Sequence, residues 1–514
     1  MTNRDGVDVL VVGAGPTGLA LAAQLQRCGT TFRIVDRAAA GVGESRALAV
    51  LPRTLEVLAT LGLADVMVEH GNPTVRLEMH SGTRTTRVPL FDIGLADTAF
   101  PFLLFLSQAE TEAILERHLA DHGVTVERGV ELVGLEPGTD RVLCTMGDGG
   151  QIVARYVVGC DGANSTVRGL AGIDFIGSPY PQTFVLADLD AAGLGPDAAH
   201  VFLSRAGMLF FFPLGRPAPW RLLAIDPTSG GRQPQLPDLQ ELVDAYTKNV
   251  DLTEPVWTSV FGLQQRRADR YRAGRVFLAG DAAHVHSPAG AQGMNTGIQD
   301  AWNLGWKLAL VANSTASTEL LDTYQHEREP IGRDVVRFTD RAFRIATSRN
   351  RLIGGLRTHL APRLLHALSR SRRARAAGFR VLSQLAVTYK DSPAVRDDRP
   401  RSRRPRAGDR VPDAPVALDG HPRTLHEILA PARFHLLTTG DAPNLDHDHI
   451  DVHQLTSRSR RGALVDADGQ AHQRLGLDPA TGGTVLVRPD GHIAYRCDGT
   501  DLTGLHHYLS RWLS

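Results

Sequence analysis

The sequence predicts an α/β protein built on a parallel sheet, and two observations support this fold class. Apolar runs such as Val9–Val12 and Arg275–Ala279 have the composition of strands that are buried on both faces in a parallel sheet. Each run leads into a glycine-containing loop and then a helical pattern, the order found in doubly wound folds. Short strands between Gly/Pro turns at 176–267 predict an antiparallel sheet inserted among the parallel elements.

The stretch Val7–Asp36 contains the first motif. Its apolar run is followed by Gly13, Gly15 and Gly18 in G-x-G-x-x-G spacing, by a helical pattern and by a second strand that ends at Asp36. Such glycines allow a tight turn, close approach of a pyrophosphate and close helix–strand contact, and the acid is placed to bind a ribose. The helix N-terminus offers free N–H groups to the phosphates. The stretch predicts a site for the ADP half of a cofactor without distinguishing NAD from FAD.

The composition narrows the classes of function. The 514 residues suffice for two or three domains, and 56 Lys+Arg balance 56 Asp+Glu, so no net charge favours nucleic acid or an anionic membrane. Four scattered cysteines form no C-x-x-C or zinc spacing, which indicates a reducing, cytoplasmic location. No apolar run is long enough to span a membrane. The arginines at 370–375 lack interleaved aromatic residues and are typical of a solvated helix face.

Elements of both kinds follow the first motif. The pattern predicts a helix, a hairpin turning at Ser81-Gly82, a second helix, a strand and a second hairpin, at 52–63, 75–88, 109–123, 124–135 and 141–152. Arg46 lies in the loop before the first of these helices, and its position alone favours an ordinary solvated arginine.

The second motif follows the predicted strand Arg155–Asp161. Asp161 and Gly162 end this strand, and Arg168 lies six residues further on. Two interpretations remain open. The motif caps a helix beside a solvated arginine, or it brings an acid, a glycine and an arginine to a binding site.

The inserted segment is predicted to form five strands, at 184–190, 201–203, 208–214, 221–226 and 256–262, with a helix at 236–250. Phe210, Phe211 and Phe212 are too apolar on consecutive positions for a sheet with one face in water. Either both faces of this sheet are covered, or one face forms the wall of a site for a flat apolar ligand.

The third motif follows Arg275–Ala279. Gly280 and Asp281 end that strand, and a glycine-rich loop opens a helix that continues to residue 310, giving a second helix N-terminus for an electron-rich group. His284 and His286 have no third ligand nearby in the sequence, so packing or hydrogen bonding is favoured and no metal is predicted.

The last part of the chain is predicted to be a separate unit. Two helices with many surface arginines are predicted at 318–347 and 352–385. The segment 399–410 that follows them has the composition of a linker. A small α/β unit follows, with strands at 434–438 and 449–454, a hairpin at 484–496 and a closing helix at 502–513.

The three motifs together resemble those of the FAD-dependent aromatic hydroxylases, the single-component flavoprotein monooxygenases typified by para-hydroxybenzoate hydroxylase, over Asp5–Lys390. GESRAL, AQGMNTGIQDAWNLGWKLA and RPDGHIAYR look most like the bacterial hydroxylases of angucycline and anthracycline polyketides, which carry a C-terminal thioredoxin-like domain. This chain has no C-x-x-C there, so a structural role or an interface of a homodimer is expected for that domain instead of redox work.

The resemblance implies a domain organisation. It comprises a Rossmann-like FAD-binding domain of the GR2 type at 1–74, 100–175 and 268–395, an antiparallel substrate-binding domain at 75–99 and 176–267, a linker at 396–410 and a thioredoxin-like domain at 411–514.

The resemblance also assigns residues. Those expected to bind non-covalent FAD are Gly13, Gly15, Thr17, Gly18, Asp36, Arg37, Arg46, Gln108, Asp161, Asp281, Gly290, Gly293, Met294 and Asn295. This reverses the interpretation of Arg46. The motif of Asp161, Gly162 and Arg168 is linked to NAD(P)H as well as FAD, and the Pro288 carbonyl is expected to face the side where oxygen reacts. Gln292 stands where para-hydroxybenzoate hydroxylase has a lysine, so a small anionic substrate does not carry over. No general base can be named.

The activity implied is NAD(P)H- and O2-dependent hydroxylation of a polycyclic phenolic polyketide. NADPH or NADH would reduce the flavin, and O2 would give a C4a-hydroperoxide that attacks an electron-rich ring carbon. The alternatives left open are Baeyer–Villiger insertion, modification of a rifamycin or tetracycline antibiotic, a flavin dehydrogenase without oxygen insertion, and a non-catalytic NAD-sensing module.

Overall fold

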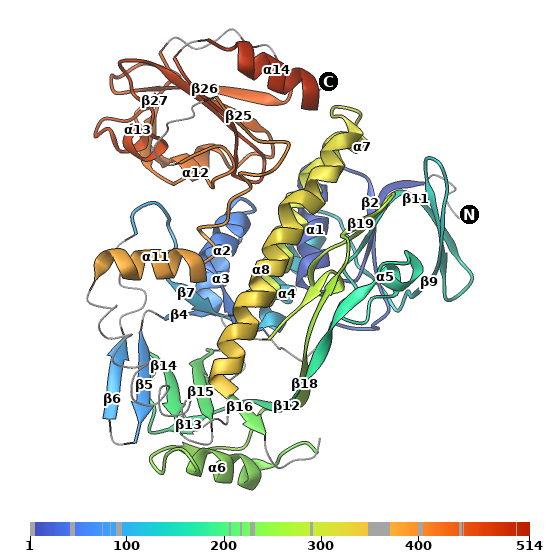
Figure 1. The fold of residues 1–514 in the computed structure, drawn as a ribbon, viewed down its shortest axis with the longest axis vertical. Coiled ribbons are helices and arrows are strands. Elements are labelled where there is room, and N and C mark those ends of the chain that lie inside the picture. Colours follow the sequence, from blue (N-terminus) through green and yellow to red (C-terminus); the bar gives the residue numbers. More distant parts are fainter. Residues whose placement is uncertain are drawn as a thin grey trace.

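The structure is a computed structural model. It describes residues 6–41, 47–74, 76–82, 84–88, 95–204, 207–215, 218–226, 232–287, 291–347, 371–398, 405–440, 445, 447–499 and 501–513. Within these residues, three eight-stranded sheets form the framework, and the predicted α/β class is confirmed. Figure 1 shows the C-terminal sheet at the top, the sheet that contains β1 on the right and the antiparallel sheet at the bottom, with long helices between them. None of the helices in the described part of the chain is long and apolar enough to cross a membrane.

The sheet on the right is parallel at its centre, as predicted. Its parallel strands, in order, are β20 (Val276–Leu278), β11 (Gln151–Gly159), β1 (Val7–Val12), β2 (Phe32–Asp36) and β8 (Glu127–Arg128). Its antiparallel additions are β19 (Arg272–Ala273), β10 (Val142–Met146) and β9 (Leu132–Pro137). The single strand predicted at 124–135 is wrong, because Gly129 turns the chain between β8 and β9 with φ +73°.

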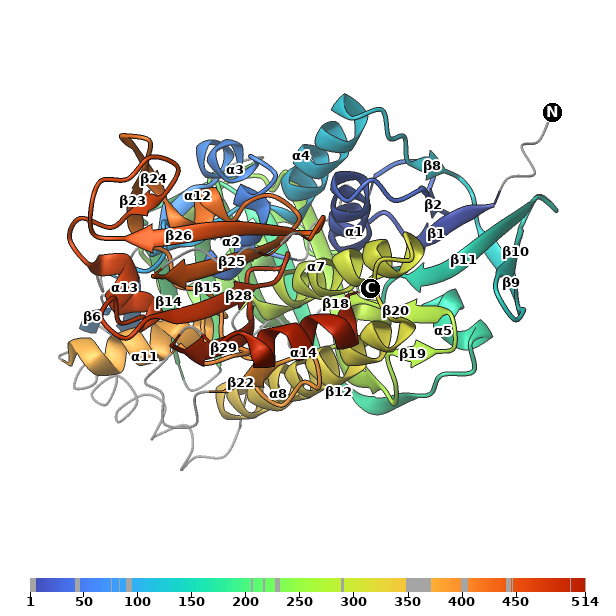
Figure 2. The same ribbon diagram turned by 90° about the horizontal axis from the view of Figure 1, so that it is seen from above.

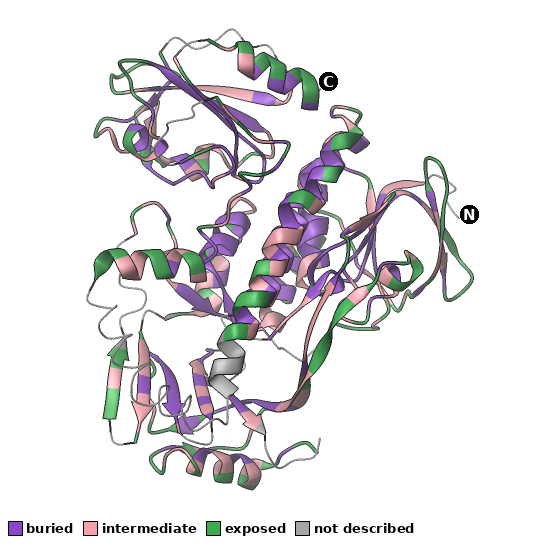
Figure 3. Ribbon diagram, in the orientation of Figure 1, coloured by how far each residue is buried: buried purple, intermediate pink, exposed green. Residues whose placement is uncertain are grey.

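Two helices bring the first and third motifs together. α1 (Pro16–Arg27) packs directly on α7 (Gln292–Ala312), where glycines remove the side chains that would separate the helices. A Cβ at Gly297 would lie 2.3 Å from Thr17 Oγ1, and one at Gly305 would lie 2.7 Å from Gln24 Cγ. α7 is buried along nearly its whole length, as the purple in Figure 3 shows.

Shorter elements surround this pair. They are α2 (Pro52–Ala59), α3 (Ala64–His70), α4 (Gln108–Asp121), α5 (Thr166–Leu170), η1 (Gly280–Ala282), η2 (Thr318–Leu321), α8 (Asp322–Thr347), α11 (Arg372–Leu382) and the small sheet of β3 (Ala49–Val50), β7 (Leu103–Phe105) and β4 (Asn72–Thr74). The Ser107 hydroxyl caps α4 by accepting a hydrogen bond of 3.1 Å from the Glu110 N–H, which fixes where the helix begins.

The inserted sheet is antiparallel apart from one parallel pair. In order its strands are β21 (His284–Val285), β18 (Trp257–Ala268), β12 (Phe175–Leu189), β16 (Trp220–Asp226), β15 (Met208–Pro213), β14 (Ala199–Leu203), β5 (Leu77–Ser81) and β6 (Arg84–Val88). The predicted 75–88 hairpin is β5–β6, and it joins the sheet by parallel pairing with β14. α6 (Leu236–Asp244) covers one face and ends before the predicted residue 250, beyond which lies the two-stranded pair β13 (Ala191–Ala192) and β17 (Asp251–Leu252).

The C-terminal sheet is mixed, as a thioredoxin-like domain requires. Its strands in order are β22 (Arg396–Asp397), β29 (Ile493–Asp498), β28 (Gly483–Val487), β25 (Phe434–Thr439), β26 (Ile450–Thr456), β27 (Leu464–Val465), β23 (Pro415–Leu418) and β24 (His421–Thr424), with helices α12 (Leu425–Ile428), α13 (Gln470–Leu475) and α14 (Thr503–Trp512). The described parts of the predicted linker 396–410 are packed instead of free. β22 pairs with β29, and Arg410 is buried against Glu56 and Asp97.

Buried ion pairs join this unit to the helices below it. Arg488 after β28 forms two hydrogen bonds with Glu327 of α8, at 2.7 and 2.9 Å, and Arg53 of α2 donates to the Asp490 carbonyl. Arg328, predicted among surface arginines, is fully buried, because Asp300 of α7 accepts its Nε–H at 2.6 Å. Seen from above, the C-terminal strands and α14 lie over α7 and α8 (Figure 2).

Candidate active site

The first motif has the backbone geometry of a phosphate-binding loop. Gly13 lies at φ +102°, and a Cβ there would be 2.4 Å from the Cys160 carbonyl oxygen. A Cβ at Gly18 would be 1.9 Å from the Gly13 carbonyl oxygen, so these two glycines are required by the fold. By contrast, apart from its chain neighbours, no heavy atom of the described residues lies within 4 Å of a Cβ position at Gly15, the residue that precedes α1. The open space therefore lies at the N-terminus of α1, where a pyrophosphate would bind.

Asp36 stands beside this loop, at the end of β2. Its carboxylate accepts hydrogen bonds from the Ala14 N–H at 2.6 Å and the Ala38 N–H at 2.8 Å, which fixes it against the glycine loop. This position suits a ribose-binding acid. Arg37 is exposed, and Arg46 lies outside the described residues.

The second motif forms the hydrogen bonds that are expected if it caps a helix. Asp161 accepts hydrogen bonds from the Ser165 hydroxyl and the Val167 N–H, and Ser165 caps α5. Arg168 is not a solvated arginine, because its guanidinium donates to the carbonyls of Ala163 and Ala282. The second of these bonds ties the second motif to the third. Gly162 lies at φ +78° and lines the cavity described below, while binding of NAD(P)H by this motif remains a prediction.

The third motif supplies a second helix N-terminus. Gly280 lies at φ +63°, which turns the chain after β20, and Asp281 is exposed at this strand end. Ala291 precedes α7 in the left-handed conformation, and no side chain of the described residues caps the helix. The first N–H groups of α7, including that of Gly293, are therefore available to an electron-rich ligand. Pro288 and Gly290 lie outside the described residues.

Two predicted cofactor residues have additional roles within the fold. The Asn295 side chain is fully buried and binds the Leu51 N–H, the Ala49 carbonyl and the Ala291 carbonyl, all at 2.8 Å, so it anchors β3 to the start of α7. Thr17 packs against Gly280 and Gly297, while also lining the cavity. The expected contacts of Asn295 and Met294 with a cofactor would come from the backbone.

A cavity of about 330 Å3 connects the motifs. The residues that the three motifs and α4 contribute to its lining include Gly15, Pro16, Thr17, Gln108, Gly162, Asp281, Gln292, Gly293 and Met294. The inserted sheet contributes the apolar residues Leu186, Leu223, Phe261 and Leu263. The sequence did not single out these four residues, because alternation along a strand shows which residues share a face and not which face meets a cavity.

The expectation that Phe210, Phe211 and Phe212 form one wall is wrong for Phe211. It lies on the far face of the sheet, fully buried with Trp220 and the residues of α6. Phe210 and Phe212 lie on the near face, stacked with their ring centroids 5.7 Å apart, and Phe210 pairs with cavity-lining Leu223. Both faces are covered, which was the other interpretation. None of the three lines the cavity itself.

This division leads to a paired prediction for Phe211→Leu and Phe212→Leu. Phe211→Leu is expected to lower the free energy of unfolding by about 1 kcal/mol, since it removes packing under α6, and to leave substrate affinity unchanged. Phe212→Leu lies toward the cavity and should change substrate affinity more than stability. Denaturant unfolding and the KM for substrate measure the two effects. A larger change in KM for Phe211→Leu would contradict the assignment of faces.

The histidines of the third motif differ from each other. His284 is fully buried and binds Asp300 through Nε2 at 2.7 Å, in agreement with the predicted hydrogen bonding. His286 lines the cavity, and burial lowers its pKa to about 4, so the ring is neutral near pH 7. Nδ1 donates to the Ser287 carbonyl, and Nε2 has no hydrogen-bond partner among the described residues. Sequence reasoning had assigned it no function.

A parallel sheet with an open glycine loop, an acid in the position that suits a ribose and a second helix N-terminus at Gly293 defines a dinucleotide-binding protein of the Rossmann class. The chain belongs to the family described as FAD binding domain, whose model matches residues 6–339, and residues 404–514 match the family described as aromatic-ring hydroxylase, C-terminal.

Individual relatives agree with this assignment over almost the whole chain. The 6-methylpretetramide 4-monooxygenase of Streptomyces rimosus is 38% identical, covering 98% of this chain and 92% of its own. The structure is similar to that of anhydrotetracycline hydroxylase from Streptomyces rimosus, with a TM-score of 0.77, 32% identity and 99% of each chain covered. Aklavinone-11 hydroxylase, solved with FAD and aklavinone, gives a TM-score of 0.76 and 27% identity, with 99% of each chain covered. The protein is therefore an FAD-dependent monooxygenase.

Proposed function

We propose that this monooxygenase hydroxylates a polycyclic phenolic compound of the aromatic polyketide class, with NADPH or NADH as electron donor. The observation that carries the substrate class is the set of apolar side chains, Leu186, Leu223 and Phe261, that line the same cavity as the glycine loops. Such a lining suits a flat, largely apolar ring system. The relatives described above are named for 6-methylpretetramide, anhydrotetracycline and aklavinone.

The residues of the cavity fit FAD in distinct roles. The space at Gly15 and the N-terminus of α1 would hold the pyrophosphate. Asp36 would bind the adenosine ribose, and Asp281 would bind the ribityl chain. The first N–H groups of α7, near Gly293, would stabilise the flavin edge that becomes negative on reduction. FAD would supply the oxygen-transfer chemistry, so the protein needs to orient the phenol and exclude water.

We assign His286 as the residue that binds the phenol hydroxyl of the substrate. The His286 ring is neutral and lines the cavity, and its buried Nε2, which has no partner among the described residues, would accept a hydrogen bond from a substrate hydroxyl once the ring rotates toward the cavity. Its low pKa makes it a weak base, so we infer that it orients the hydroxyl instead of removing the proton.

The His286→Leu variant tests this role. It is expected to lower kcat/KM about tenfold, because the net value of one neutral hydrogen bond is about 1–1.5 kcal/mol. His286→Gln retains an acceptor and should lose less. Substrate-stimulated NADPH oxidation measures both variants, and unchanged kcat/KM in His286→Leu would refute the assignment.

A screen of polycyclic phenols under labelled O2 tests the function as a whole. The expected result is NADPH oxidation stimulated by a polycyclic phenol and one labelled oxygen atom on an aromatic carbon of the product. A ring-expanded product would instead indicate Baeyer–Villiger insertion. Incorporation of the labelled oxygen into a rifamycin or a tetracycline would indicate an antibiotic-modifying role. An oxidised substrate that carries no labelled oxygen would indicate a dehydrogenase. If no compound stimulated NADPH oxidation, a binding module would be indicated.

A further inference from the structure

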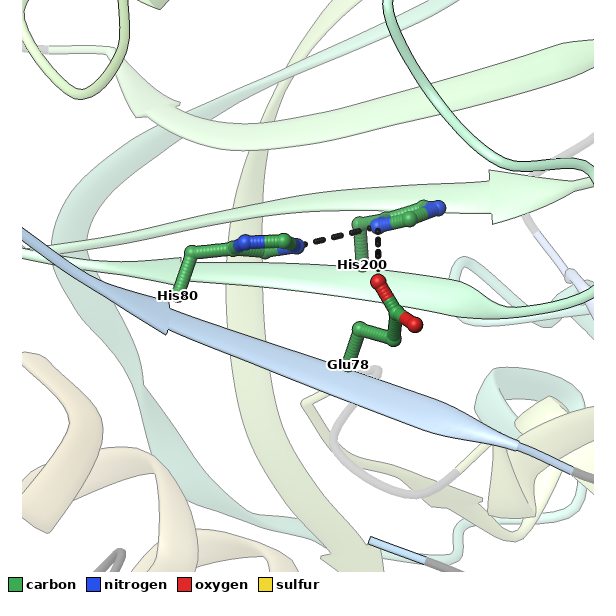
Figure 4. A group of neighbouring side chains, drawn as sticks. All are labelled: Glu78, His80 and His200. Carbon is green, nitrogen blue, oxygen red and sulfur yellow. Dashed lines mark hydrogen bonds and ion pairs between the residues drawn. The ribbon is translucent and has the colours of Figure 1, made fainter. Parts of the chain in front are cut away.

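Two histidines and a glutamate meet at the edge of the inserted sheet. Glu78 and His80 alternate along β5, and His200 lies on the parallel neighbour β14, directly opposite Glu78. The three side chains therefore share one face, and they point toward one another in Figure 4. The intervening Met79 packs on the other face with Val201 and near Phe210, the face that leads to the cavity. The cluster is thus separated from the active site by the sheet.

The atoms are spaced as ligands of one ion. His80 Nε2 lies 3.0 Å from His200 Nδ1, and Glu78 Oε2 lies 3.8 Å from the same nitrogen. Ligands at zinc–nitrogen and zinc–oxygen distances around a tetrahedral ion are about 3.4 Å apart. The observed distances lie on either side of this value, so small side-chain rotations would complete the site.

The partners of the two rings allow a cation between them. His200 Nε2 is 2.9 Å from the Gly195 carbonyl, which can only accept, so the proton is on Nε2 and the Nδ1 lone pair faces His80. His80 Nδ1 lies 3.1 Å from the Thr85 hydroxyl. If His80 Nδ1 donates to this hydroxyl, the lone pair of His80 Nε2 faces the lone pair of His200 Nδ1. A carbonyl or hydroxyl on the outer nitrogen is the usual arrangement of a metal-binding histidine.

The cluster is also rigid. His200 is 2% exposed, and the His80 ring stacks on Phe202 with centroids 4.4 Å apart. Arg87, whose side chain is 80% exposed, binds the other oxygen of Glu78 at 2.8 Å and leaves Oε2 facing the histidines. Ordering three ligands costs less free energy when their rotamers are already fixed.

We propose that Glu78, His80 and His200 form a binding site for a divalent transition-metal ion, with water as a fourth ligand. Two imidazoles and one carboxylate, with a water in the fourth position, are a ligand set that zinc accepts in proteins. Because the ligands come from β5 and β14, far apart in the sequence, the ion would fasten the β5–β6 hairpin to the sheet. Its position behind the sheet assigns it a structural role.

Zinc titration of the full-length flavoprotein after chelator treatment tests the site. The expected result is one tight equivalent of Zn2+ that raises the melting temperature, with affinity reduced at least about tenfold in His80→Gln and Glu78→Gln. His122→Gln, which alters the exposed histidine that follows α4 and contacts the His118 ring, is the matched control and should bind as the wild type does. Co2+ in place of Zn2+ should give a four-coordinate visible spectrum that the His80→Gln variant lacks.

Two outcomes would overturn the proposal. The first is no saturable Zn2+ binding by the wild type at micromolar concentration, which would mean that the rings share a proton. The second is an unchanged affinity in both His80→Gln and Glu78→Gln. His80 and Glu78 are only partly buried, so these variants should fold, and their flavin content and melting temperature without metal verify this.

Discussion

Replacing Glu327 with alanine is expected to destabilise the folded protein by about 3–5 kcal/mol, the usual cost of removing one partner from a buried ion pair. The Glu327 carboxylate accepts hydrogen bonds from Lys307, Asn303 and Ser392 in addition to two from Arg488. Its removal would leave the positive charges of Arg488 and Lys307 facing only Asp490, away from water. Glu327→Gln keeps the shape and should cost less.

The same group makes the effect depend on pH. Burial alone would raise the pKa of Glu327, but Arg488 and Lys307 hold it well below its usual range. A carboxyl whose pKa is lowered by folding contributes its stability above the unfolded pKa, near 4.5, and loses it as the pH falls toward the folded pKa. The difference between the wild type and Glu327→Ala should therefore shrink below about pH 4.5.

Denaturant unfolding followed by fluorescence, with limited proteolysis of the C-terminal unit, measures this loss. Asp140→Asn is a suitable control, because the Asp140–Arg275 pair is 3.5 Å long and the Asp140 side chain is 89% exposed. Such a pair contributes about 0–1 kcal/mol. An equal midpoint for Glu327→Ala and Asp140→Asn would show that the junction is not held by these charges.

Gly15→Ala is expected to weaken FAD binding at least about tenfold while the protein stays folded. The backbone at Gly15 has φ −76° and ψ −176°, which any residue adopts, and beyond its chain neighbours the added Cβ meets no atom of the described residues within 4 Å. The methyl group would instead occupy the space where the pyrophosphate approaches the N–H groups of α1. A tenfold loss corresponds to about 1.4 kcal/mol of binding free energy.

Flavin absorbance after dialysis, beside the circular dichroism spectrum, measures binding and folding separately. Gly378→Ala in α11 also adds a Cβ with nothing within 4 Å and should keep its flavin. Gly18→Ala should instead lose its fold around α1, since its Cβ would lie 1.9 Å from the Gly13 carbonyl oxygen. Stoichiometric flavin in Gly15→Ala would place the pyrophosphate elsewhere.

The motifs were predictable from the sequence because they are local. Gly13 and Gly280 follow apolar strands, and Gly18 lies in the first turn of α1, so their task depends on backbone geometry that a few neighbouring residues set. Parallel strands deliver their carboxyl ends to one edge, so the meeting of three loops followed from the fold class. Which residues of a motif also hold the fold together was less predictable. The Asn295 side chain, for example, binds the backbone of Leu51 and Ala49.

The faces of the inserted sheet required the tertiary structure. The run of Phe210, Phe211 and Phe212 shows alternation but not which side α6 covers, so Phe211 was misplaced. The buried charges of Arg328, Glu327 and Arg488 also escaped prediction. An arginine on a helix resembles a surface residue until its partner, 28 or 161 residues away in the sequence, is known.

The sequence by itself therefore determined the α/β class and the three glycine-containing motifs, because short-range backbone geometry encodes them, and the FAD-binding family followed from the resemblance of the three motifs taken together. Only the tertiary structure decided the apolar wall of the cavity, the charged junction with the C-terminal unit and the meeting of Glu78, His80 and His200. Each of these depends on side chains that are distant in the chain and adjacent in space, and strand register and helix packing set that adjacency.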